Sequence, residues 1–137
     1  MGKIIFHGHS FLEVHTGKHI ILIDPFVSGN PKCDVKAGDL KCDYIILTHG
    51  HDDHVGDSVQ IAEKNDATII GMVEITDSVY EKVKAHGMNL GGGYNFDFGR
   101  VKLTLAHHSS SAPGGKYLGS PAGILLSVEG KCIYHAG

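Results

Sequence analysis

The stretch that decides the fold is YIILTHGHDDHVGD, residues 44–57, in which an apolar run ends in three histidines and two aspartates. The apolar run predicts a buried strand, and the polar cluster begins at the carboxyl end of that strand. Imidazoles and carboxylates that are crowded together repel or desolvate one another unless a positive charge lies between them. The cluster therefore predicts a metal ion bound at the end of a buried strand.

The length and composition predict one globular domain over residues 1–137. The net charge is −3 and no basic run is present, so a dedicated nucleic-acid binder is not expected. No apolar run approaches the length of a membrane span, and the N-terminal MGKIIFHGHS lacks the apolar core of a secretory signal. These features predict a cytoplasmic protein without a membrane partner.

The cysteines do not form a recognisable framework. Cys33, Cys42 and Cys132 are odd in number and contain no C-x-x-C pair, which argues against disulfides and against a cysteine zinc site. We expect reduced, structural thiols, with Cys132 acting as a small hydrophobic residue in an apolar strand.

Local patterns predict an α/β (α+β) order of elements. Three strand-like runs at 3–7, 11–16 and 18–25 predict an antiparallel meander, followed by a surface loop over 25–43. A helix is expected within 55–65, and a strand at 67–73.

The second part of the chain gives weaker patterns. Ile75, Val79 and Val83 recur every four residues and predict a helix that Gly87 ends. The glycine-rich residues 89–99 predict a turn region. The next run predicts a strand with Val101, Leu103 and Leu105 facing inward, and a hairpin is expected to turn at residues 129–130.

The histidine spacing suggests how the ligands divide. The H-x-H spacing lets His49 and His51 chelate one ion, while Asp53 and His54 can turn towards a second ion. A further ligand must come from elsewhere, and the strand that ends in His108 supplies one.

The sequence THGHDDH at residues 48–54 resembles the T-H-x-H-x-D-H motif of the metallo-β-lactamase superfamily. The segments FHGHSFLEV, ILIDPFVSGNP, HHSSS, PAGILLS and YHAG, in this order, are similar to the bacterial metal-dependent hydrolases related to L-ascorbate-6-phosphate lactonase. The resemblance implies an αβ/βα sandwich of two similar halves. This chain would supply the N-terminal half and the first strands of the second half.

By this resemblance, His49, His51 and His108 would hold the first metal, and Asp53 and His54 would bind the second. Zinc is favoured because imidazole and carboxylate ligands with an open position suit it, with Mn²⁺ or Fe²⁺ as alternatives. The complete fold would contain two sites. Asp53 would also be catalytic, by orienting the water that attacks the substrate. Asp24 resembles the family's buried aspartate that supports the metal loop through hydrogen bonds.

The remaining histidines leave alternatives open. His9 either faces the pocket, where it would be catalytic by orienting substrate or protonating a leaving group, or is satisfied by a backbone carbonyl at a strand end. His7, on the same strand face as His9, is expected to be structural, and His107 to be a neighbour of the site without a role. Ser109 to Ser111 either cap a turn or hydrogen-bond a substrate phosphate, and the turn cap is the favoured interpretation.

The chain also departs from the family. The segment YHAG normally leads to an aspartate that bridges the two metals, and the second half of the fold supplies one more histidine. We therefore expect that the chain lacks the C-terminal part, that the Asp53–His54 site is weak, and that an exposed apolar face leads to homo-oligomers or to pairing with a complementary C-terminal chain.

The expected function is that of a metal-dependent hydrolase in which an activated water attacks a small-molecule ester, lactone or phosphodiester. The alternative is a non-catalytic metal-binding or oligomerisation module.

Overall fold

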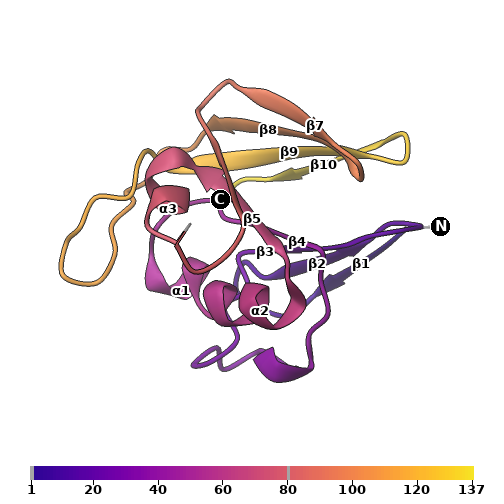
Figure 1. Ribbon diagram of the computed structural model, residues 1–137, viewed down its shortest axis with the longest axis horizontal. Helices are drawn as coiled ribbons and strands as arrows, with labels where there is room; N and C mark the ends of the chain where they lie inside the picture. Colours follow the sequence, from indigo (N-terminus) through magenta and orange to yellow (C-terminus); the bar gives the residue numbers. More distant parts are fainter. Residues whose placement is uncertain (1, 80) are drawn as a thin grey trace.

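Two facing sheets form the protein, whose computed structural model describes residues 2–79 and 81–137. Figure 1 shows the four-stranded sheet on one side of the six-stranded sheet and the short helices α1 and α2 on the other. The expected α/β class is therefore confirmed. Among the described residues, no helix is long and apolar enough to cross a membrane.

The six-stranded sheet takes its strands in chain order. The first three strands pair antiparallel, as the meander predicted, and the rest pair parallel. The strands are β1 (Lys3–Phe6), β2 (Leu12–His15), β3 (Ile20–Ile23), β4 (Tyr44–Ile46), β5 (Thr68–Met72) and β6 (Ala85–Met88).

The second sheet is antiparallel throughout, in the order β10-β9-β8-β7. Its strands are β7 (Gly93–Phe96), β8 (Gly99–Leu105), β9 (Ala122–Val128) and β10 (Lys131–His135). The hairpin between β9 and β10 turns at Glu129 and Gly130, as expected. Both residues have positive φ, 50° and 73°, which the favoured two-residue turns require.

The helices are short and occupy the connections. They are α1 (Asp52–Val55), α2 (Ser58–Asn65), α3 (Val73–Asp77) and the 3₁₀ helix η1 (Ala37–Asp39), which lies in the predicted 25–43 loop. The helix predicted within 55–65 is α2, and α1 precedes it as a separate short helix.

The core lies between these layers. Ile45 and Ile46 point to opposite faces of β4, yet both are fully buried, because the second sheet covers one face and helices cover the other. Burying one such side chain stabilises the fold by about 1.5–3 kcal/mol, which explains why the central strands are continuous apolar runs.

The parallel arrangement positions the polar residues. β3 and β4 run in the same direction, so their carboxyl ends lie at one edge of the sheet, where Asp24 and residues 47–54 follow. The backbone N–H of Asp24 donates to the carbonyl of Ile46 over 3.1 Å, which holds the carboxyl ends of β3 and β4 together.

One predicted helix is wrong. The helix α3 stops at Asp77, and residues 85–88 form β6, which pairs with β5. Gly87 lies inside this strand and does not end a helix. A Cβ there would lie 2.8 Å from Thr76 Oγ1, so the close approach of α3 requires glycine.

Three smaller expectations also fail. The predicted turn region contains a strand, β7, which gains its hydrogen bonds from β8. Leu105, at the end of β8, is 60% exposed because it lies beyond the covered part of the sheet. Cys132 is exposed on the edge strand β10, whereas Cys42 is buried; all three cysteines are free thiols.

Candidate metal centre

Three histidine rings converge in the first cluster. His49 Nε2 lies 3.1 Å from His51 Nδ1, and the His108 ring centroid lies 4.9 and 5.0 Å from the centroids of His49 and His51. One nitrogen of each ring lies within 4.8 Å of the others. His49 is buried, His51 half-buried and His108 exposed, so the cluster opens to solvent on one side. Three nitrogen donors with one open side fit a catalytic zinc site.

The residues behind His49 determine which ring nitrogen is available. The Thr48 hydroxyl donates its one proton to Asp24 Oδ2 over 2.6 Å, because a carboxylate only accepts. The same hydroxyl oxygen lies 2.8 Å from His49 Nδ1 and accepts that nitrogen's proton. The His49 Nε2 lone pair is therefore left free to face the cluster.

Asp24 supports two ligands at once. Its Oδ1 accepts the Thr48 backbone N–H over 2.9 Å, and its Oδ2 accepts the His54 Nδ1 proton over 2.8 Å. Asp24 is fully buried and has a positive φ of 48°. Metal-binding histidines usually donate their second N–H to a carboxylate or carbonyl, so both arrangements suit ligation through Nε2.

Burial, and to a smaller extent the nearby His54, lower the pKa of His49 to about 4. His49 is thus neutral at pH 7. A neutral imidazole is the form that binds a metal, so no proton must be removed from this ligand at neutral pH.

A second cluster joins His9, Asp53 and His54. His9 Nε2 lies 3.2 Å from Asp53 Oδ2, and His54 Nε2 lies 4.0 Å from Asp53 Oδ1. The two clusters adjoin each other, since the rings of His49 and His54 have centroids 4.0 Å apart. The structure thus brings together all six histidine and aspartate residues that the sequence assigned to metal or catalysis.

His9 does not lie on the strand face that was expected. β1 ends at Phe6, and Gly8 and His9 adopt positive φ angles of 93° and 56° in the following turn. His9 therefore reaches Asp53, and the contact found for its ring nitrogen is a carboxylate. His7 is buried, as a structural role requires, with its ring nitrogens 2.7 Å from Asp34 and 2.8 Å from Glu13.

An open pocket of about 460 Å³ adjoins both clusters. His107 lines this pocket beside His108, as a neighbour of the site that belongs to neither ligand cluster. The reason is a tight turn after β8, in which the His108 N–H donates to the Ala106 carbonyl over 3.1 Å. Because of this turn, His107 and His108 do not point to opposite faces as neighbours in a strand do. The lining residues are Ser10, His49, His54, Leu105, Ala106, His107, His108, Tyr134, Ala136 and Gly137.

Ser110 ties the metal loop to the loop over 106–121. Its hydroxyl accepts the Gly50 N–H over 2.9 Å and donates to the Leu118 carbonyl over 3.2 Å. This contact joins two loops, whereas a local turn cap was expected. Ser109 Oγ lies 3.3 Å from His51 Nε2, at the solvent side of the first cluster.

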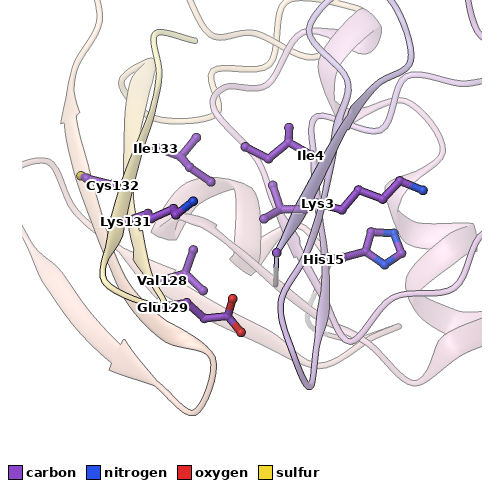
Figure 2. A pocket seen from close by; sticks show the side chains of 10 residues that line it. Lys3, Ile4, His15, Val128, Glu129, Lys131, Cys132 and Ile133 are labelled. Atoms are coloured by element: carbon purple, nitrogen blue, oxygen red, sulfur yellow. The ribbon is translucent and has the colours of Figure 1, made fainter.

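A smaller cavity of about 240 Å³ lies between the β1–β2 and β9–β10 hairpins (Figure 2). Apolar side chains such as Ile4, Val128 and Ile133 line it, and the Glu129 carboxylate accepts the Gly17 N–H over 2.6 Å. None of its lining residues belongs to the two clusters, so this cavity is separate from the metal centre.

Known proteins resemble this chain over most of its length. The family described as the metallo-beta-lactamase superfamily matches residues 6–128. A UPF0173 metal-dependent hydrolase of Bacillus cytotoxicus is 50% identical over 141 residues, which cover 98% of this chain and 62% of that protein. A protein of the same name from Anoxybacillus flavithermus is 49% identical over 140 residues, with the same coverage of 98% and 62%.

Among solved structures, Igni18, a metallo hydrolase from the archaeon Ignicoccus hospitalis, superposes with a TM-score of 0.84 and 30% identity. The superposition covers 98% of this chain and 59% of that one. The chain thus spans about three fifths of the length of the curated relatives it matches.

Proposed function

Because the chain belongs to the metallo-β-lactamase superfamily, we propose that it forms the metal-binding part of a metal-dependent hydrolase. The observation that carries the proposal is the convergence of His49, His51 and His108, of which His49 and His108 line the open pocket. The names of its relatives, which are about 50% identical, point the same way. Zinc fits the donor set best, with Mn²⁺ or Fe²⁺ as alternatives.

The three histidines would hold the first ion, and Asp53 and His54 would contribute to the second. When bound, such ions supply Lewis acidity and bring the pKa of a water molecule close to neutrality. Asp53 is half exposed, so its carboxylate can accept a hydrogen bond from a water beside the second cluster and orient it. Asp24 would orient two of these ligands, His49 through Thr48 and His54 directly.

The open pocket suits a small-molecule ester, lactone or phosphodiester. The exposed serine and histidine side chains around it can donate hydrogen bonds to substrate oxygens. We propose a cytoplasmic location, which fits three free thiols of which Cys132 is exposed.

The alternative of a purely structural metal module is less well supported. Structural zinc sites are closed and use four protein ligands, many of them cysteine. Here His108 and Asp53 are exposed, and the described cysteines lie outside the ligand clusters.

The test compares two adjacent histidines. His108→Ala should reduce zinc affinity by about 100-fold or more and abolish hydrolysis of an activated ester, because it removes a ligand. The matched variant His107→Ala should retain metal content. Elemental analysis that finds no metal, with none recovered on adding zinc or manganese, would contradict the proposed function. Equal metal loss in both variants would contradict the assignment of His108.

A further inference from the structure

The residue pair Asp53 and His54 has a third neighbour, His9, whose Nε2 faces the Asp53 carboxylate. We propose that His9 is the third protein ligand of the second metal ion, so that this ion binds to His9, Asp53 and His54. The inference rests on the proposed function, because it concerns the same metal centre. It assigns His9 a ligand role in place of the substrate-orienting or acid role that the sequence suggested.

The spacing of the three ligand atoms suits one ion. His9 Nε2 lies 3.2 Å from Asp53 Oδ2, and all three ligand atoms lie within 4.8 Å of one another. Zinc bonds to nitrogen and oxygen at about 2.0–2.2 Å, which places tetrahedral ligand atoms about 3.4 Å apart. Small side-chain rotations therefore bring the three atoms onto a common centre.

The rings are already oriented for this. Asp24 accepts the Nδ1 proton of His54, which leaves Nε2 as the free ligand atom. The His9 ring meets Phe26 edge-on, with centroids 5.5 Å apart and planes at 79°, and its centroid lies 5.0 Å from that of His54.

The segment that carries Phe26 is packed directly against the end of α1, the helix that supplies Asp53 and His54. A Cβ at Gly56 would lie 2.7 Å from Phe26 Cα, so only glycine permits this approach. Phe26 thereby links the position of the His9 ring to that of the helix.

The backbone at His9 adds an independent observation. A φ of 56° is uncommon for a non-glycine residue, and in this turn it lets the His9 ring reach Asp53. The turn is held rigid from both sides. His7 is bound between Asp34 and Glu13, and a Cβ at Gly8 would lie 2.5 Å from Lys32 Cβ.

A third ligand changes the expectation for the second site. The Asp53–His54 site was expected to be weak because a bridging carboxylate usually screens the repulsion between two neighbouring ions. A neutral imidazole adds a strong bond without further charge. Binding should then occur in two steps, with the three-histidine cluster filling first.

The experiment titrates chelator-treated protein with Zn²⁺ by calorimetry and with Co²⁺ by absorption spectroscopy. The variant is His9→Asn, since asparagine tolerates the left-handed conformation and preserves the turn. His107→Asn is the matched control, because it changes an exposed histidine of the same pocket. NMR of Co²⁺-loaded protein labelled with ¹⁵N-histidine identifies the coordinated rings.

We expect two ions per chain in the unaltered protein and in His107→Asn. His9→Asn should keep the first affinity, which also shows that it is folded, and bind the second ion about 100-fold more weakly. One set of strongly shifted histidine resonances should disappear.

The contrary outcomes are distinct. Unchanged binding of two ions by His9→Asn would overturn the ligand role of His9, as would a single ion in the unaltered protein, and both leave the proposed hydrolase intact. Loss of all metal binding in the unaltered protein would overturn both proposals.

Discussion

At His49, the direction of one hydroxyl proton determines which ring nitrogen can bind metal. Thr48 gives that proton to Asp24 and accepts the proton of His49 Nδ1. The same carboxylate orients His54. One buried aspartate thus sets the tautomers of two histidines that belong to adjoining clusters.

The lowered pKa of His49 predicts how the metal-free protein responds to acid. The folded pKa of about 4 lies below the ordinary value of 6.5, so the unfolded chain binds more protons between these values. The contribution of neutral His49 to stability is complete above pH 6.5 and falls as the pH drops towards 4. Urea denaturation should give a lower free energy of unfolding at about pH 5 than at about pH 7.5. The difference between the two pH values should be smaller in His49→Gln, which lacks the titrating imidazole. An equal decline in both proteins would contradict the prediction.

At the scale of elements, the contact between two loops holds the centre together. Gly50 and Leu118 touch so closely that a Cβ on Gly50 would lie 2.6 Å from Leu118 Cβ. Ser110 bonds to both residues. The loop that carries His51 and the loop that carries His108 therefore move as one unit.

Gly50→Ala should force these loops apart. We expect a loss of about 1–3 kcal/mol in the free energy of unfolding, as is typical of overpacking, together with weaker zinc binding by the first cluster. Leu118→Gly removes the opposing Cβ, so the double variant should lose less than the sum of the single losses. Additive losses, measured by denaturation and zinc titration, would show that the contact is not what couples the loops.

The sequence predicted those elements whose signals are local. The meander, the strands β4 and β5, and the hairpin at Glu129 each have apolar runs or turn residues of their own. β6 was missed because the spacing of Ile75, Val79 and Val83 imitates a helix, while the strand depends on pairing with β5, about 16 residues earlier.

The site divides in the same way. His49, His51 and His54 could be assigned from a motif because their spacing within one loop determines their geometry. The place of His9 depends on a positive φ, and that of His107 on a tight turn after β8. Neither conformation is predicted by a sequence pattern at these positions.

At the scale of the whole molecule, large apolar side chains remain exposed. Leu105 and Tyr134 are about 60% exposed and line the metal pocket together. Phe6 and Ile4 on the first strand are exposed to a similar degree. Apolar surface of this kind favours association.

We predict that the protein self-associates through the surface around Leu105 and Tyr134. Sedimentation velocity should show a species heavier than the monomer whose fraction rises with concentration. Leu105→Gln combined with Tyr134→Ser should shift the protein towards monomer, because it removes the exposed apolar area. Tyr94→Ser, which alters an exposed aromatic residue of β7, is the control. If Tyr94→Ser, and not the double variant, shifted the protein towards monomer, the contact would lie on β7 and not around Leu105 and Tyr134.

The chain order of the six-stranded sheet has a consequence for how the protein is made. Every strand from β2 to β6 pairs with its predecessor, so this sheet can form as the chain leaves the ribosome, before β7 is synthesised. Pulsed hydrogen exchange during refolding should accordingly protect the amides of β3 to β5 before those of β8 and β9. His9, Asp24, Asp53 and His54 all belong to this early part, whereas His108 follows β8. A nascent chain would thus meet its first metal ion at the site that the finished protein fills second.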